Sequence, residues 1–186
     1  MAKKRNFIIT AFLDFFEVVF IGIAVFVIVY IFVGQLMEVN GSSMEPNFQN
    51  KEQIIAEKVS LGFKKLQRGE VIIARQPQNP EKLLIKRVIG LPNETIKISQ
   101  GKVYINEKEL DEPYLPKNTT TIEDSTIKED VIYKIPEESY IIMGDNREDS
   151  TDSRSWGAVP KDLIVGRALL VYYPLKEIKF VAKDLF

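Results

Sequence analysis

The sequence predicts a mainly β protein, in which a single N-terminal transmembrane helix carries an all-β domain. The first observation is an apolar run without a charged residue, VVFIGIAVFVIVYIFVGQLM, from Val18 to Met37. The second is a series of short segments rich in Val, Ile and Tyr, separated by Gly, Pro, Asn or Asp, which is typical of strands. No segment after Met37 keeps a helical period for more than two turns, so the remainder is expected to be β.

The apolar run is expected to form a transmembrane helix over residues 18–37. At 1.5 Å per residue it is about 30 Å long, which matches the hydrocarbon core of a bilayer. A cleavable signal peptide is the alternative, but its apolar region is usually only about 7–15 residues long. Residues 1–17 are then a short N-terminus and membrane entry, and residues 38–186 form the domain beyond the membrane.

Basic residues predict the orientation of this helix. Lys3, Lys4 and Arg5 precede the apolar run, and the next Lys or Arg is Lys51. Because basic segments stay on the cytoplasmic side, the N-terminus is expected in the cytoplasm and the domain outside it. The predicted location is therefore the cell membrane, crossed once, with an extracytoplasmic domain.

The domain is expected to contain seven main strands. Ser99-Gln100-Gly101 lies between two of them and is typical of a tight hairpin, with Gly at a position of positive φ. Residues 111–130 are polar, Thr-rich and without a period, so they are expected to form a surface loop or insertion. The expected strands are Gln53–Val59, Glu70–Arg75, Leu83–Ile89, Glu94–Ser99, Lys102–Ile105, Tyr140–Met143 and Ile164–Tyr173.

The composition excludes several classes of site. The chain has no Cys and no His, which excludes disulfides, thiol nucleophiles, Cys/His zinc sites and a Ser-His-Asp triad. A net charge of −1 gives no indication of nucleic-acid binding. In the Asp-rich stretch that starts at Asp145, Arg147 stands where a calcium loop needs an oxygen ligand. No metal and no cofactor are expected.

The stretch Asn40 to Pro46, NGSSMEP, follows the apolar run closely and contains the first candidate nucleophile, Ser43. With histidine and cysteine absent, lysine is the remaining side chain that could act as a base near neutral pH, provided that it is held neutral. A structural alternative exists, because Ser42 and Glu45 match a helix capping box and a serine at this point could simply form a turn.

Lys86 is the candidate base. In LLIKRVI an extended strand places Leu84, Lys86 and Val88 on one face, so the ammonium group is expected to be desolvated, which lowers the pKa of a lysine. Arg87 points to the other face and adds like-charge repulsion. The alternative is a strand lysine whose amine reaches the solvent.

A third stretch, GDNREDSTDSR from Gly144 to Arg154, follows the apolar strand YIIM directly. A charged run of this kind is usually a hydrated turn. However, Asp152 and Arg154 could form a charge-assisted pair that keeps the loop rigid and leaves Ser150 to bond inward.

Together, the three stretches resemble the ordered motifs of bacterial type I signal peptidases, the membrane-anchored Ser/Lys proteases that remove signal peptides. Ser43 to Pro46 is similar to the family's S-M-x-P box, Lys86 to Pro92 to its K-R-V-x-G-x-P box, and Gly144 to Arg154 to its G-D-N-R-x-x-S-x-D-S-R box. The segment DEPYL, Asp111 to Leu115, is also similar to one in the family.

The resemblance implies a β catalytic domain of the signal peptidase type and a role for each matching residue. Ser43 would be the nucleophile and its N–H an oxyanion donor, with Lys86 as the general base. Ser150 would orient the lysine amine. The residues that would support the third box are Asp145, Asp152 and Arg154.

Three positions differ from the common family pattern. Asn47 stands where many members have Thr, and Asn93-Glu94 replaces Gly-Asp after the second box. Gly41 stands where some members carry a hydroxyl that helps the oxyanion, so Ser42 is the candidate second oxyanion donor. Met44 is the candidate wall of one substrate pocket.

The predicted function is signal peptide cleavage at the outer membrane surface by a serine endopeptidase with a Ser/Lys dyad. The expected partners are the lipid bilayer and preproteins with small residues before the cleaved bond. One alternative is a catalytically silent, membrane-anchored homologue acting as a scaffold, which would be expected to lack Ser43 or Lys86. A soluble self-cleaving Ser/Lys regulator should carry a DNA-binding segment instead of the apolar span.

Overall fold

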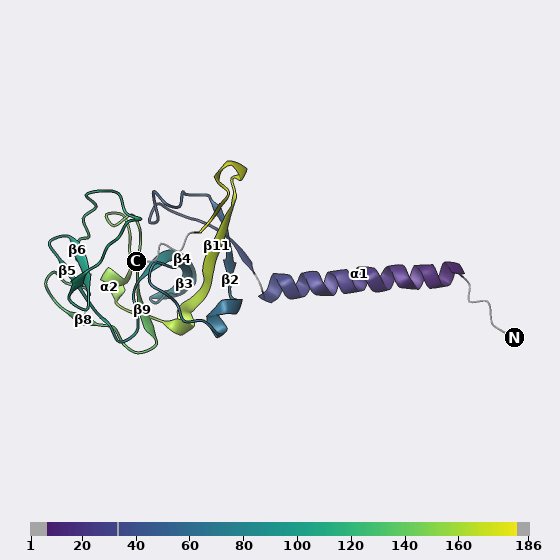
Figure 1. Cartoon of the computed structure of the whole chain (residues 1–186), viewed down its shortest axis with the longest axis horizontal. Helices are drawn as coiled ribbons and strands as arrows, with labels where there is room; N and C mark the ends of the chain where they lie inside the picture. The colour runs from purple at the N-terminus through teal and green to yellow at the C-terminus, as the bar shows by residue number, and fades with distance from the viewer. Residues whose placement is uncertain (1–6, 33, 182–186) are drawn as a thin grey trace.

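The structure is a computed structural model that describes residues 7–32 and 34–181. A long helix projects from a β-rich domain, and it leaves the domain beside β2 and β11 (Figure 1). The helices are α1 (Phe7–Phe32) and α2 (Ser153–Trp156), with 3-10 turns η1 (Val59–Gly62), η2 (Lys161–Leu163) and η3 (Leu175–Glu177). The strands are β1 (Gln35–Glu38), β2 (Gln53–Glu57), β3 (Val71–Gln76), β4 (Asn79–Gly90), β5 (Thr95–Ser99), β6 (Lys102–Ile105), β7 (Lys108–Glu109), β8 (Tyr133–Lys134), β9 (Ser139–Met143), β10 (Val159–Pro160), β11 (Ile164–Tyr173) and β12 (Lys179–Phe180).

The bounds of the long helix correct the predicted span of residues 18–37. The helix begins at Phe7 and ends at Phe32, and Gln35–Glu38 pairs with β2 as strand β1. The prediction began after the last acidic residue and therefore excluded Asp14 and Glu17, which the helix contains. The part Ile9–Val27 is long and apolar enough to cross a membrane, and none of the other described residues buries it.

An eight-stranded antiparallel sheet forms the larger part of the domain. Its order is β1-β2-β11-β3-β4-β9-β10, and β12 pairs with β11. One apolar cluster packs on this sheet close to β1, the first strand. It includes Met44, Ile54, Ile73 and Val171. β4 lies between β3 and β9, so a residue in the second half of β4 is enclosed by strands on both sides.

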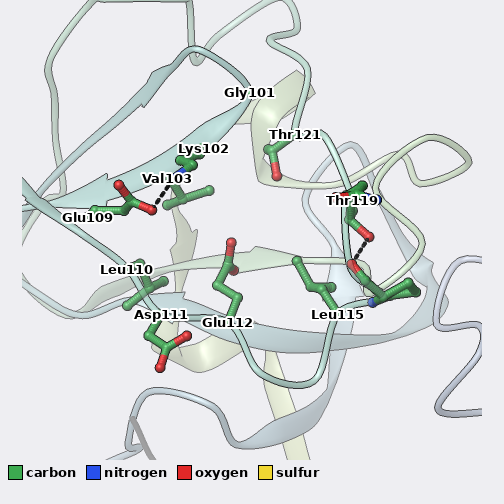
Figure 2. A pocket seen from close by; sticks show the side chains of 12 residues that line it. Gly101, Lys102, Val103, Glu109, Leu110, Asp111, Glu112, Leu115, Thr119 and Thr121 are labelled. Carbon is green, nitrogen blue, oxygen red and sulfur yellow. Dashed lines mark hydrogen bonds and ion pairs between the residues drawn. The ribbon is translucent and has the colours of Figure 1, made fainter.

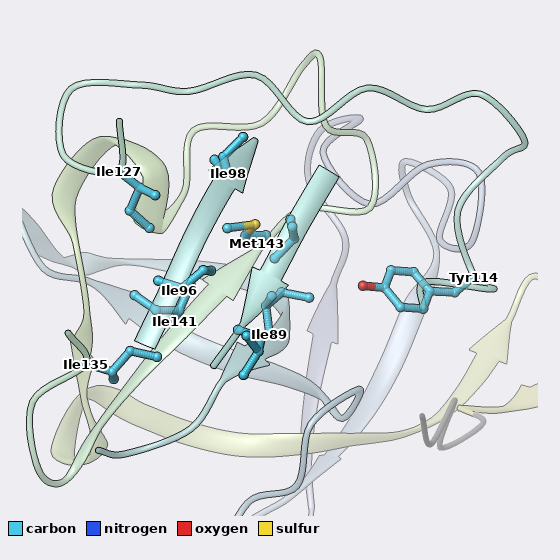
Figure 3. Packing of buried hydrophobic residues seen from close by; sticks show 10 residues of the cluster. Ile89, Ile96, Ile98, Tyr114, Ile127, Ile135, Ile141 and Met143 are labelled. Carbon is cyan, nitrogen blue, oxygen red and sulfur yellow. The ribbon is translucent and has the colours of Figure 1, made fainter. Parts of the chain in front are cut away.

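A second, four-stranded antiparallel sheet, β7-β6-β5-β8, packs against β9 and the end of β4. Figure 3 shows how Ile96 and Ile98 of β5 meet Ile89, Ile141 and Met143 in a cluster of buried side chains. Both sheets therefore meet along the part of β4 that pairs with β9, from Arg87 to Gly90. The second sequence box includes this part of β4, and the third follows Met143 at the end of β9.

The prediction of a mainly β domain behind one apolar helix is confirmed, with differences in detail. All seven expected strands are present, but β2 is shorter than expected and β4 begins at Asn79, because Pro80 is accommodated near the start of the strand. Gln100 and Gly101 have φ of 50° and 75°, as a tight β5–β6 hairpin requires. Residues 111–130 are more than a surface loop, because they contribute the buried side chains Tyr114, Thr121 and Ile127 to the interior.

Candidate active site

Ser43 lies on the turn that follows β1. Two backbone hydrogen bonds close the base of this turn, from Val39 N to Glu52 O and from Lys51 N to Val39 O, both 2.8 Å long. Gly41 has φ of 105°, a conformation that favours glycine, and its N–H donates to Asn50 Oδ1 at 3.0 Å. The turn thus holds Ser43, which is half-buried, at the surface of the eight-stranded sheet.

Lys86 meets Ser43 from β4. Its Nζ donates a hydrogen bond of 2.5 Å to Ser43 Oγ, and only 2% of the residue is exposed. Lys86 shares its face of β4 with Leu84 and Val88, and it lies opposite Ile72 of β3. The expectation that this strand alternation buries the lysine is therefore met, and the alternative of an amine that reaches solvent is wrong.

Burial lowers the pKa of Lys86 from 10.5 to about 8. The carboxylates of Asp152 and Asp145 oppose this effect, whereas the charges of Lys82 and Arg154 add to it. Arg87 was expected to add repulsion, but it is neutralised on the other face of the strand. A useful fraction of Lys86 is therefore neutral near pH 8, which is the state that a general base needs.

The loop of the third box holds the Ser43 turn in place. Asn146 donates from its N–H to Ser43 O at 3.1 Å and from Nδ2 to Ser42 O at 3.2 Å. Gly144 passes so close that a Cβ added there would collide with Ser43 O and with the Ser150 side chain. Asn146 has no assigned role in the sequence prediction, although its position in the third box could have suggested one.

Ser150 lies beside Gly144, near the backbone of Ser43, and its hydroxyl has another partner. It donates to Asp152 Oδ2 at 2.8 Å, whereas the amine of Lys86 is bonded to Ser43. The role of orienting the lysine amine therefore stays a prediction for Ser150. Its position beside Gly144 nevertheless places it at the same site.

Asp152 and Arg154 form a buried pair inside the third-box loop. Arg154 Nε lies 2.8 Å from Asp152 Oδ1, and Arg154 also donates to the carbonyls of Arg147 and Ser150. Burial alone would raise the pKa of Asp152, but hydrogen bonds and charge from Arg154, with bonds from Gly144 and Ser150, lower it. The pair connects both ends of the loop, as expected of a rigid third box.

Asp145 is held by a second buried pair that the sequence did not reveal. Arg87 Nε and Nη2 donate to Asp145 Oδ1 and Oδ2 at 2.9 and 2.7 Å, and Asn47 donates to Asp145 Oδ2 at 2.8 Å. The Arg87 guanidinium also lies 4.1 Å from the centre of the Tyr114 ring. Asn47, one of the departures from the family pattern, thus links the Ser43 turn to the third box.

Arg147 is a further buried residue that the prediction used only to argue against calcium. It donates to Gly144 O, to Thr121 Oγ1 and to Glu112 Oε2, at 3.0, 2.6 and 3.1 Å. These bonds attach the third-box loop to the segment 111–121. The sequence signal that could have pointed to this buried role was an arginine inside a motif that otherwise resembles a hydrated turn.

One predicted role needs correction, and a second stays a prediction. Met44, the candidate wall of a substrate pocket, is fully buried in the apolar cluster and does not line the cleft at Ser43. It anchors the turn because a methionine between two polar residues finds apolar partners only in the interior. Ser42, the candidate oxyanion donor, donates its hydroxyl hydrogen bond to Asp149 Oδ2.

A cleft of about 670 Å³ opens at Ser43 and Lys86. One side is formed by β1 and the Ser43 turn, and the other by β4, and Asp149 and Thr151 also line it. Its apolar lining includes Leu36, Val39, Ile54, Ile73, Leu84 and Ile85. A cleft between two strands suits an extended peptide.

A separate hollow of about 390 Å³ lies on the four-stranded sheet, away from this cleft (Figure 2). Its walls include Lys102, Glu109 and Thr121, and neither Ser43 nor Lys86 lines it. Within residues 7–32 and 34–181, no group of three Asp or Glu side chains is arranged to hold a metal ion.

The chain is similar to known proteins of one family. The sequence model of the family described as "Signal peptidase, peptidase S26" matches residues 12–173. A probable signal peptidase I-2 from Synechocystis is 35% identical over 158 residues, which cover 82% of this chain and 69% of the relative. Signal peptidase I from Bacillus amyloliquefaciens is 31% identical over 181 residues, which cover 95% of this chain and 96% of the relative.

A crystal structure of a signal peptidase I from Enterococcus faecalis is also similar, at 30% identity and a TM-score of 0.45. It covers 56% of this chain and 97% of that one. The family match includes all three boxes and most of the chain, and it confirms the resemblance drawn from them. The chain belongs to the signal peptidase family, peptidase S26.

Proposed function

We propose that this protein is a signal peptidase I that cleaves signal peptides with a Ser43/Lys86 dyad. The observation that carries the proposal is the 2.5 Å contact between Lys86 Nζ and Ser43 Oγ, made by a lysine whose pKa is lowered to about 8. A serine hydroxyl needs a neighbouring base to become a nucleophile, and this chain has no histidine.

The reaction proceeds by acyl transfer. The neutral amine of Lys86 takes the Ser43 proton as Ser43 Oγ attacks the carbonyl carbon of the scissile bond. The resulting ammonium gives this proton to the leaving amine, and an acyl-enzyme remains. Water then attacks the ester, with Lys86 again accepting a proton. The two carbonyl bonds from Asn146 and the buried Asp152–Arg154 pair keep the dyad in register during both steps.

The N–H of Ser43 is the proposed donor to the tetrahedral oxyanion. Within the described part of the chain, no group accepts a hydrogen bond from this N–H. It is therefore available to the oxygen on which negative charge develops. Ser42 does not supply a second donor in this arrangement, because its hydroxyl proton is engaged by Asp149.

The substrates are membrane-inserted preproteins, and the site acts beside the bilayer. α1 ends at Phe32 and β1 begins at Gln35, so the chain from the helix end to Ser43 spans at most about 40 Å. The apolar cleft between β1 and β4 accepts the small residues that precede a signal peptide cleavage site. With Lys3 to Arg5 in the cytoplasm, the domain lies outside.

The alternative of a catalytically silent scaffold has no support in the comparisons. Both residues that a silent homologue would be expected to lack are present, and they are in contact. A purified, full-length sample in detergent micelles tests the proposal directly. It is incubated with a preprotein that carries an A-x-A cleavage pattern, and the new N-terminus of the product is sequenced.

The purified wild-type protein, with no other protease present, should cut the preprotein directly after the A-x-A pattern. Ser43→Ala, Lys86→Ala and Lys86→Arg should each lose at least about 10³-fold in kcat/KM, because arginine keeps its proton and cannot act as the base. Lys65→Arg, an exposed lysine away from the cleft, is the matched control and should retain full activity. Cleavage by Lys86→Arg at a wild-type rate would contradict the dyad.

A further inference from the structure

A carboxylate next to the nucleophile has no part in the proposed mechanism. Asp149 lines the cleft together with Ser42 and Ser43, and its Oδ2 accepts the hydrogen bond of the Ser42 hydroxyl. Neither the ordered motifs nor the acyl-transfer steps assign a task to this contact. Ser42 and Asp149 are 107 residues apart in the sequence, so the bond joins two loops rather than two neighbours.

The third-box turn that contains Asp149 also forms hydrogen bonds with the peptide unit between Ser42 and Ser43. Asn146 Nδ2 donates to Ser42 O at 3.2 Å, and Glu45 N donates to the same carbonyl at 3.0 Å. Asp149 N donates to Asn146 O at 3.3 Å, so the two residues that hold the Ser43 turn belong to one tight turn. The carbonyl and the side chain of Ser42 are therefore both fixed by this turn.

Because the peptide bond is planar, the contacts that fix the Ser42 carbonyl also fix the direction of the Ser43 N–H. Ser42 O and the N–H of Ser43 belong to one trans peptide unit, in which the two groups point in opposite directions. With Ser42 O directed to Asn146, the N–H of Ser43 must point away from it. The hydrogen bond from the Ser42 side chain to Asp149 then limits the rotation of Ser42, the residue at which this peptide unit starts.

The Ser42 hydroxyl could donate its hydrogen bond either to Asp149 or to the oxyanion. A hydroxyl has one proton, so Ser42 cannot donate to Asp149 and to an oxyanion at the same time. In the structure this proton is donated to Asp149 Oδ2. We propose that Asp149 is a positioning residue, which acts through Ser42 to keep the N–H of Ser43 aimed at the oxyanion. This inference rests on the proposed function, because it assigns that N–H to the oxyanion.

Four variants of the full-length protein test the role of Asp149. Asp149→Ala and Ser42→Ala should each lower kcat about tenfold with little change in KM, since the oxyanion forms only after the substrate has bound. The double variant should be no worse than either single one, because both act through the same bond. Asp149→Asn should recover most of the rate, because its amide oxygen can accept the same hydrogen bond.

The matched control is Glu148→Ala, which removes an exposed carboxylate from the adjacent position of the same loop. It should cleave at the wild-type rate. Equal rates for Asp149→Ala and Glu148→Ala would overturn the inference. A fall in Ser42→Ala without a fall in Asp149→Ala would also overturn it, because Ser42 would then be the oxyanion donor and Asp149 its competitor.

Hydrogen exchange separates this inference from the proposed function. Asp149→Ala and Ser42→Ala should accelerate exchange of the amides in residues 40–46, whereas Glu148→Ala should not. Unchanged exchange in those residues would refute the positioning role whatever the activity. A wild-type protein that fails to cut any preprotein would refute the peptidase proposal, and the exchange measurement would still decide whether Asp149 holds the turn.

Discussion

Replacing Lys86 by methionine should reveal how much stability the protein gives up to keep this lysine buried. Methionine has a similar length and no charge, and it suits the surroundings of Leu84, Val88 and Ile72. The pKa of Lys86 is about 8 in the folded protein and 10.5 without burial. That gap corresponds to about 3 kcal/mol, which the folded state pays when the amine is charged.

The sign of the pH dependence follows from proton binding. Below about pH 8, both the folded and the unfolded protein hold the proton, and the penalty is fully present. Between about 8 and 10.5 only the unfolded chain keeps it, so the free energy of unfolding of the wild type rises with pH relative to Lys86→Met. The variant should be the more stable protein at pH 6.5, and its advantage should shrink by about 3 kcal/mol by pH 10.5.

Urea unfolding in detergent micelles, followed by Trp fluorescence, measures this difference. Trp156 is the single Trp of the chain and packs against an apolar cluster of the domain, so the signal reports the domain and not α1. Loss of the bond to Ser43 costs about 1 kcal/mol at any pH and only offsets the curve. A stability difference that stays constant from pH 6.5 to 10.5 would refute the conclusion that burial lowers the pKa of Lys86.

The rate of cleavage should rise with pH through about 8 and then level off, because only the neutral Lys86 acts as base; a pH–rate profile of kcat/KM without that rising limb would exclude the lysine. Arg154→Met should lower the free energy of unfolding by about 3–5 kcal/mol by leaving the Asp152 carboxylate buried without its partner, and a wild-type melting temperature would disprove this. Gly144→Ala should destabilise the protein by about 1–3 kcal/mol and reduce cleavage, since its Cβ would collide with Ser43 O and Ser150; full activity in the same preprotein assay would show that the loop can move aside.

Local patterns predicted the parts of the structure that depend on neighbouring residues. The alternation of Leu84, Lys86 and Val88 correctly placed the lysine on an apolar face, because side-chain direction in a strand repeats every two residues. The Gln100-Gly101 turn was recognisable for the same reason, since its backbone conformation favours particular residues. The helix bounds were wrong because a search for a charge-free run rejects Asp14 and Glu17, which a helix can contain.

Contacts between distant segments could not be predicted in this way. Arg87 pairs with Asp145, 58 residues away, and this contact depends on the pairing of β4 with β9. The direction of Arg87 toward the other face of its strand was foreseen, but its partner was not. Met44 was assigned to a pocket wall because it adjoins Ser43 in the sequence, whereas the turn directs it into the core. The roles of Ser43, Lys86 and the third-box residues in catalysis remain predictions until the variants are measured.

The contacts around Ser43 also determine when, during folding, the site can form. Lys86 lies 43 residues from Ser43 in the sequence, and Asn146 lies 104 residues from Ser42. Contacts of such long range form late, because the chain must first lose the entropy of closing large loops. A growing chain therefore exposes its serine and its lysine well before it contains the loop that aligns them. A newly synthesised copy, or one truncated before Arg154, is expected to be inert toward every peptide it meets.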